Sequence, residues 1–227
     1  MRNSKDKSVK SLDNITPYEV EDYCINHSTE EHPILTDIYR QTHLTQVSPR
    51  MASGNIQGQF LQLLCKLHKP KNVLEIGTFT GYAAMSMALA MPETSKLTTL
   101  EINPEMEDFV QNYIHKSNME DRINLIIGDA RKFLSSSNET WDFVFLDANK
   151  EHYIEYLDML LPKMSKGGII IADNVLWGCK VVAQQNAEKI DSDTLALMRF
   201  NDYVQKHNAV ENLLLPLRDG LMIIQIK

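Results

Sequence analysis

The sequence predicts an α/β protein built on a mostly parallel sheet, and three features of the chain support this fold class. Residues 72–81, Asn-Val-Leu-Glu-Ile-Gly-Thr-Phe-Thr-Gly, join a short apolar strand to a glycine loop, and a helical pattern follows. This order is typical of the first unit of a nucleotide-binding sheet. Strand-like and helical segments alternate five times from there, which favours parallel strands. Residues 209–217 and 221–227 flank an Asp-Gly turn signal, which predicts an antiparallel hairpin at one edge.

The composition is that of an ordinary globular protein. The chain has 227 residues, with 43% hydrophobic and 23% charged residues, enough for one domain with a full core. The net charge of −7 gives no electrostatic footprint for nucleic acid. Cys24, Cys65 and Cys179 lack metal-type spacing, and the polar N-terminus lacks the apolar segment of a signal peptide. An odd number of cysteines leaves one over from any pairing, so we expect a protein of the reducing cytosol. No apolar run is long enough to cross a membrane.

The segment before the sheet is expected to be a helical cap over residues 14–70, preceded by a disordered tail at residues 1–13. Pro17 follows Thr16 in the pattern of a helix start, because proline suits the first helical position. The expected helices of the cap are 16–24, 33–43 and 60–67, with a polar segment at 48–59 between the last two.

Residues 71–227 are expected to form the Rossmann-like core of a single domain. The expected strands are 72–76, 96–102, 123–128, 142–147 and 168–172, followed by the hairpin. The expected helices are 82–91, 104–117, 151–161 and 193–207, with none assigned between the third and fourth strands.

The glycine loop is the first candidate for ligand binding. Gly77 and Gly81 allow a sharp turn and the close approach of a ligand. Glu75 lies in an apolar strand, and because burying an unpaired acid is costly, we expect it to support the loop from inside. Position 79 is Phe, so the Gly-x-Gly-x-x-Gly fingerprint is absent and a nicotinamide dehydrogenase is disfavoured. Glu101 ends the second strand, where an acid can bind both ribose hydroxyls of an adenosine.

Polar residues also follow the later strands, at the edge where a parallel sheet binds its ligands. Asp129 follows the third expected strand, Asp147 ends the fourth, and Asp173-Asn174 follows the fifth. Two carboxylates and an amide oxygen are hard ligands that suit Mg²⁺, Mn²⁺ or Ca²⁺. An Asp-Asn pair alone is also common turn chemistry, so for that pair the purely structural interpretation stays open.

Several motifs together resemble the metal-dependent S-adenosylmethionine O-methyltransferases, a family that includes the caffeoyl-CoA and catechol O-methyltransferases. The resemblance runs from about Met51 to the C-terminus, and the Asp-x-x-Lys motif with the later Gly-Gly-x-x-x-x-Asp-Asn motif is its most specific part. The matching segments are 51–59, 73–82, 100–102, 141–150 and 167–174.

The resemblance implies a class I methyltransferase sheet and a role for each matching residue. It implies that Met51, Ser53, Glu75, Gly77, Thr78, Gly81, Tyr82, Glu101, Ile102, Asp129, Ala130 and Asp147 bind S-adenosylmethionine. It implies that Asp147, Asp173 and Asn174 bind the metal ion, that Lys150 and Asp147 are catalytic, and that Lys150 and Asn174 contact the substrate. Trp177 is a further candidate for the wall of the substrate site. Ala83 departs from the family, which usually has a serine there that helps to hold the methionine carboxylate.

The chemistry of methyl transfer fits this residue set. The sulfonium methyl is already activated, so the protein must supply a deprotonated oxygen in line with it. A phenol loses its proton only near pH ~10, and a divalent cation stabilises the phenolate. Lys150, partly desolvated beside that cation, is expected to have a lowered pKa and to act as a general base.

We therefore predict a cation-dependent O-methyltransferase, expected as a homodimer, that acts on a small catechol-like or hydroxylated aromatic acceptor. A tRNA hydroxyuridine is an alternative acceptor, since it also offers adjacent oxygens, although the acidic charge makes nucleic acid less favoured. A cofactor-binding module without catalysis is the alternative that Ala83 suggests.

Overall fold

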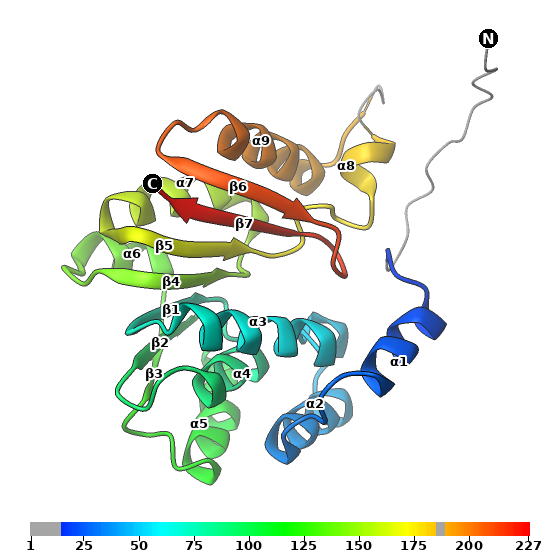
Figure 1. Cartoon of the computed structure of the whole chain (residues 1–227), viewed down its shortest axis with the longest axis vertical. Helices are drawn as coiled ribbons and strands as arrows, with labels where there is room; N and C mark the ends of the chain where they lie inside the picture. Colours follow the sequence, from blue (N-terminus) through cyan, green and yellow to red (C-terminus); the bar gives the residue numbers. More distant parts are fainter. Residues whose placement is uncertain (1–14, 185–188) are drawn as a thin grey trace.

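The computed structural model describes residues 15–184 and 189–227, and the tail expected to be disordered lies outside them. Its centre is a seven-stranded sheet in the order β3-β2-β1-β4-β5-β7-β6 (Figure 1). The strands are β1 (Asn72–Ile76), β2 (Lys96–Glu101), β3 (Ile123–Ile127), β4 (Trp141–Leu146), β5 (Met164–Ala172), β6 (Val210–Leu215) and β7 (Leu221–Ile226).

The strand pairing confirms the expected topology. The pairs from β3 to β5 are parallel, whereas β7 pairs with both β5 and β6 in the antiparallel sense. The order reverses at β1, whose neighbours are β2 on one side and β4 on the other. The crevice beyond the ends of β1 and β4 is therefore where a sheet of this kind places its ligand.

Helices cover both faces of the sheet (Figure 1). The α-helices are α1 (Tyr18–Asn26), α2 (Pro33–Thr45), α3 (Asn55–His68), α4 (Tyr82–Ala90), α5 (Glu107–Lys116), α6 (Ala130–Ser136), α7 (Tyr153–Leu160), α8 (Lys180–Ala183) and α9 (Ser192–Lys206). Short 3-10 turns lie at Pro49–Met51, Pro104–Met106, Lys150–His152 and Leu161–Lys163. No helix in the described ranges is long and apolar enough to cross a bilayer.

Alternate residues of each strand feed two separate cores. In β4, Phe143 and Phe145 point toward α2, α3, α4 and α5, while Val144 and Leu146 point toward α6, α7 and α9. All four side chains are buried. Because successive side chains of a strand point to opposite faces, a strand that is apolar throughout must be covered on both sides. Strand β4 is therefore held by packing on both of its faces.

Four elements differ clearly from the sequence expectation, and one of them is the short helix α8, which was not expected. Helix α6 was not expected; it begins directly after Asp129, whose side chain accepts the Arg131 backbone N–H at 2.8 Å and caps the helix. Helix α3 begins at Asn55 rather than at residue 60, after Gly54 at a φ of 76°. Strand β5 begins at Met164, four residues earlier than expected, and it includes Gly167 and Gly168.

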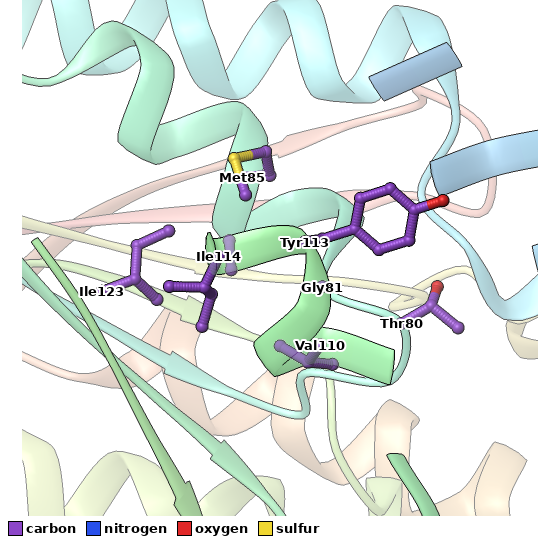
Figure 2. A pocket seen from close by; sticks show the side chains of 8 residues that line it. Thr80, Gly81, Met85, Val110, Tyr113, Ile114 and Ile123 are labelled. Carbon is purple, nitrogen blue, oxygen red and sulfur yellow. The ribbon is translucent and has the colours of Figure 1, made fainter. Parts of the chain in front are cut away.

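A small apolar cavity lies behind the glycine loop (Figure 2). It is lined by Thr80, Gly81, Ala84, Met85, Val110, Tyr113, Ile114 and Ile123, and its volume is about 10 Å³. This space is at the lower limit for one water molecule. It is therefore a packing defect between α4 and α5 rather than a ligand site.

Glu75 is fully buried in β1 and supports the loop above it, as expected. Its Oε2 accepts a hydrogen bond from the hydroxyl of Thr99, which in turn lies 2.5 Å from the hydroxyl of Thr78. Burial raises the pKa of Glu75 to about 8, although the hydrogen bond from Thr99 opposes the shift. A buried series of polar contacts thus links the strand to the loop, through one carboxyl group and two hydroxyls.

Gly77 packs directly against the tip of β4. Its φ is 101°, and a Cβ at this position would lie 2.0 Å from the backbone oxygen of Asp147. The Asp147 N–H donates to the Ile76 oxygen at 2.9 Å, so the two strand tips are hydrogen-bonded at the same place. Only glycine satisfies both the backbone angle and this close approach.

We expect Gly77→Ala to lower the free energy of unfolding by about 2 kcal/mol or more, because it combines backbone strain with a backbone clash. Urea unfolding measures this change. Gly167→Ala is the matched control: its φ is 76°, but nothing lies within 4 Å of its added Cβ. It should cost about 1 kcal/mol from backbone strain alone. Equal losses in the two variants would contradict the close contact with Asp147.

We expect Glu75→Gln to change how stability depends on pH. Because the native pKa of Glu75 is about 8 against an ordinary 4.5, the folded state holds a proton that the unfolded state has lost between these values. Rising pH must therefore destabilise the wild type through this window, by up to about 1.4 kcal/mol per pH unit, and then have no further effect. The variant has no such proton, so urea unfolding from about pH 5 to about pH 8 should show its stability rising relative to the wild type. A constant difference across this range would refute the buried, protonated acid.

Candidate active site

A cleft of about 1200 Å³ opens beyond the ends of the parallel strands. All the site residues expected from the sequence line it, except Glu75 and Gly81. Those two lie behind its wall, where Glu75 is buried under the loop and Gly81 faces Val110 of α5. Most of the residues expected from the sequence therefore lie around one cleft. The direct cofactor contacts implied for Glu75 and Gly81 stay predictions.

Glu101 holds the glycine loop in place at one end of the cleft. Its Oε2 accepts the Phe79 N–H at 2.7 Å, and its Oε1 accepts the Asn103 N–H at 2.8 Å. Phe79 has a φ of 50°, which is uncommon for a residue with a side chain. Each carboxylate oxygen keeps a lone pair for another donor, so Glu101 can still bind the hydroxyls of a ribose.

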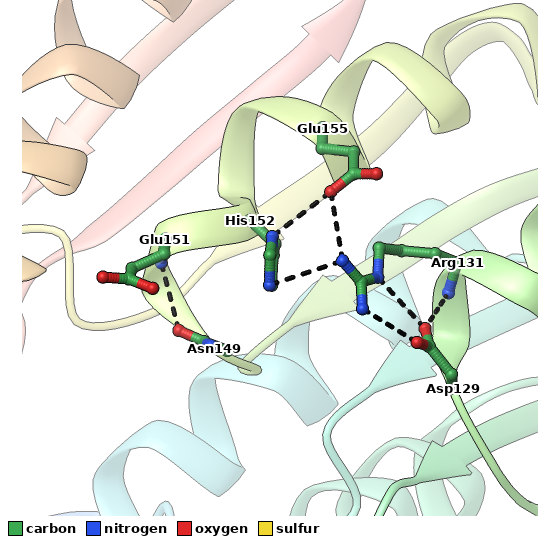
Figure 3. A network of polar contacts seen from close by, with 6 residues as sticks. All are labelled: Asp129, Arg131, Asn149, Glu151, His152 and Glu155. Carbon is green, nitrogen blue, oxygen red and sulfur yellow. Dashed lines mark hydrogen bonds and ion pairs between the residues drawn. The ribbon is translucent and has the colours of Figure 1, made fainter.

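Asp129 begins a polar network along the same end of the cleft (Figure 3). Its Oδ2 pairs with Arg131 Nη2 at 2.8 Å, and the Arg131 guanidinium lies 3.6 Å from Glu155 and 3.5 Å from the Nε2 of His152. His152 Nδ1 contacts Glu155 at 3.2 Å. The hydrogen bonds from Arg131 lower the pKa of Asp129 to about 2. Asp129 is thus an anion that caps α6, and Asp129, Arg131 and His152 of this network line the cleft together with Ala130.

The tips of β4 and β5 carry the second group of polar residues. Asp147 Oδ1 lies 2.7 Å from Lys150 Nζ, which also lies 3.0 Å from the Tyr153 hydroxyl. Asp173 is buried; its Oδ2 accepts from Gln57 Nε2 at 2.6 Å and its Oδ1 accepts the Asn174 N–H at 2.6 Å. Two carboxylates, an ammonium and an amide are therefore gathered at neighbouring strand ends.

The charges of this group act on Lys150. Burial disfavours the charged form of Lys150, but the carboxylate of Asp147, with Tyr153 and Asp173, outweighs burial, so the pKa of Lys150 is raised. The lowered pKa was expected for Lys150 beside a bound cation, and that expectation stays a prediction. Burial and the neighbouring Asp147 raise the pKa of Asp173. The two carboxylates are thus close enough to repel each other, and a cation between them would be stabilised.

The donor set fits a divalent cation of the oxygen-preferring class. Asp147, Asp173 and Asn174 could hold Mg²⁺, Mn²⁺ or Ca²⁺ through oxygens and leave positions for water and substrate. Within residues 15–184 and 189–227, no cluster of three His, Cys, Asp or Glu side chains forms a metal site. A set of two carboxylates and one amide is compatible with that finding, because only two of its members belong to those residue types.

The backbone after β5 is held in an uncommon conformation. Asn174, Trp177 and Cys179 have φ values of 60°, 49° and 61°. Non-glycine residues at positive φ cost energy and gather at functional sites. The indole N–H of Trp177 is buried and has no hydrogen-bond partner in the described part of the chain. These features make the loop after β5 a candidate for contact with a bound ligand.

The turn between β6 and β7 holds this loop from outside. The Leu176 N–H donates to the Asp219 oxygen at 2.9 Å, and the Val175 N–H donates to the Gly220 oxygen at 3.1 Å. The Asp219 carboxylate accepts the Gly178 N–H and lies beside the Asn174 amide. This turn thus anchors Leu176, Gly178 and Asn174. The sequence predicted the hairpin but not its contacts with this loop.

Sequence reasoning missed four further residues of the site: Gln57, Arg131, Tyr153 and Asp219. Gln57 lies in the polar segment before Gly58, but its contact with Asp173 joins residues far apart in the chain. Tyr153 lies three residues after Lys150, at a helical spacing that could have suggested their contact. For Arg131 and Asp219 the sequence carried no signal beyond a charge beside a turn.

Comparison with known proteins identifies the family. The profile of the O-methyltransferase family matches residues 25–227. The chain is 34% identical to caffeoyl-CoA O-methyltransferase 2 of Populus trichocarpa, over 76% of this chain and 74% of that protein. It is 29% identical to the probable caffeoyl-CoA O-methyltransferase 3 of Dictyostelium discoideum, over 92% of this chain and 90% of the relative.

Solved structures agree with this assignment. The SAH-bound methyltransferase PaMTH1 of Podospora anserina superimposes with a TM-score of 0.85 at 27% identity, covering 94% of this chain and 98% of that one. An O-methyltransferase of Bacillus cereus in complex with SAH gives 0.83 at 25% identity, over 92% and 97% of the two chains. The chain belongs to the O-methyltransferase family and is a class I, S-adenosylmethionine-dependent O-methyltransferase of the caffeoyl-CoA type.

Proposed function

We propose that this O-methyltransferase depends on a divalent cation and methylates a small aromatic acceptor with adjacent hydroxyls. One observation carries the proposal: Asp147 and Asp173 end two neighbouring strands, with Asn174 beside them and Lys150 2.7 Å from Asp147. A cation held by the three oxygen donors would lower the pKa of an acceptor hydroxyl and orient it.

The chain's own residues then perform three tasks. Gln57 holds Asp173 from the side of α3, through a hydrogen bond of 2.6 Å, and fixes the direction of its carboxylate. The Lys150 ammonium lies at the same rim, where its charge favours the ionised form of a neighbouring acceptor oxygen. Met51 and Trp177 border the cleft and provide apolar surface for an aromatic ring. The acceptor hydroxyl gives its proton to solvent water, and its oxygen then forms a bond to the methyl carbon as the bond from that carbon to the sulfonium sulfur breaks. This leaves a neutral thioether on the cofactor.

Two alternatives have weaker support. A tRNA hydroxyuridine also offers adjacent oxygens, but the net charge of −7 opposes binding to a polyanion. A cofactor-binding role without catalysis has only Ala83 in its favour. A homodimer and a cytosolic location are further parts of this proposal.

We expect Asp147→Asn to abolish most methyl transfer, because it removes one of two carboxylates from the proposed cation site. Mn²⁺ affinity, measured by electron paramagnetic resonance, should fall by more than about 100-fold, beyond the loss caused by changing an outer residue. Asp202→Asn is the matched control, since Asp202 is an exposed residue of α9 that pairs with Lys206 at 3.6 Å; it should change neither quantity. Full activity of the wild type in excess EDTA would remove cation dependence from the proposal.

We expect labelled methyl transfer to a catechol to exceed transfer to the matching monohydroxy phenol by about tenfold or more, since only adjacent oxygens can chelate. A panel with both compounds, a phenylpropanoid and bulk tRNA measures this preference with and without Mg²⁺. Transfer to tRNA alone would establish the nucleic-acid alternative. Cofactor binding without turnover on any acceptor would establish the module without catalysis.

A further inference from the structure

The cations of the cleft differ in how they are paired. Arg131 pairs with Asp129 at 2.8 Å, and Lys150 pairs with Asp147 at 2.7 Å. Arg218 also lines the cleft and is half-buried, yet in the described part of the chain it makes no ion pair. The hydrogen bond that it makes runs from Nη1 to the backbone oxygen of Ala52, at 3.1 Å. A guanidinium has five N–H donors, so most of the hydrogen-bonding capacity of Arg218 is free.

The turn between β6 and β7 places Arg218 firmly. Its φ is 50°, and the turn closes through a hydrogen bond of 2.9 Å from the Gly220 N–H to the Leu217 oxygen. Besides contacting Ala52, Nη1 lies 3.5 Å from the position that a Cβ on Gly54 would take. Arg218 therefore touches the residues on both sides of Ser53, in the segment that borders the cleft.

The charges of the cleft leave one group of the cofactor without a partner. S-adenosylmethionine has a sulfonium, an ammonium and a carboxylate on its methionine part. Glu101, Asp129, Asp147 and Asp173 line the cleft, so its walls are rich in acids that suit the two cations but repel the carboxylate. At the first turn of α4, Ala83 also lines the cleft and offers no hydroxyl.

We propose that Arg218 binds the methionine carboxylate of the cofactor. Its fixed position beside Ser53 brings a cation and free N–H donors to the segment bordering the cleft, and guanidinium is the side chain that best matches a carboxylate. The proposal rests on cofactor binding by this family member and does not require a metal ion. A carboxylate on the acceptor is the other group that the same guanidinium could bind.

Binding of two cofactor analogues distinguishes these roles. Calorimetry without metal compares S-adenosylhomocysteine with its decarboxylated analogue, which keeps the amine and lacks the carboxylate. We expect Arg218→Gln to weaken S-adenosylhomocysteine about tenfold or more, the effect of losing a charged hydrogen bond. The decarboxylated analogue should bind to Arg218→Gln at least as tightly as it binds to the wild type. The affinity of Arg218→Lys for S-adenosylhomocysteine should lie between those of the wild type and Arg218→Gln, because lysine keeps the charge but loses the fork geometry.

Arg50→Gln is the matched control, because Arg50 is an exposed cation at the rim of the same cleft. It should change both affinities by less than about twofold, as expected for a screened surface charge. An equal loss of both analogues in Arg218→Gln would overturn the proposal and assign Arg218 to the structure of the turn. Unchanged S-adenosylhomocysteine binding, with a raised KM for carboxylated catechols but not for pyrocatechol, would overturn it in favour of the acceptor. If Arg218→Gln does not fold, Arg218→Lys decides between these outcomes by the same comparison.

Discussion

The close contact between the β1 and β4 tips is the constraint on which the site depends. Gly77 meets the backbone of Asp147 at a distance that excludes any side chain. This contact sets where the glycine loop leaves β1 and where Asp147 leaves β4, and the two cores on either face hold both strands at that height. The cofactor loop and the proposed cation ligands are therefore positioned by one interaction, and neither can move without the other.

Much of this arrangement could be predicted from the sequence, because its signals are local. The apolar strands, the glycine loop and the Asp-Gly hairpin each lie within a few residues, and the sheet rule then brings their ends together. Asp147, Asp173 and Asn174 were placed at one rim by that rule alone. Helix α6 was missed because Asp129 was considered only as a ligand residue, and the hydrogen bond by which it also caps the helix was not expected.

The rest could not be predicted because it depends on residues distant in sequence. The sequence did not show that Asp147, Tyr153 and Asp173 would surround Lys150 and raise its pKa. Gln57 of α3 donates to Asp173 after β5, and Arg218 of the last hairpin donates to Ala52. No periodicity or motif encodes such contacts. These contacts form once the sheet order has placed the segments side by side. They determine the protonation and the orientation of the side chains in the site.

The C-terminal hairpin has a consequence for biosynthesis. Strand β7 ends one residue before the C-terminus and lies between β5 and β6, and the turn before it anchors Leu176 and Gly178. Because β7 comes after the other strands in the sequence, it is also synthesised after them, and until it pairs with β5 the turn cannot anchor the loop after β5. This side of the cleft is thus completed only once β7 has been made, and a chain truncated before β7 would lack these anchors.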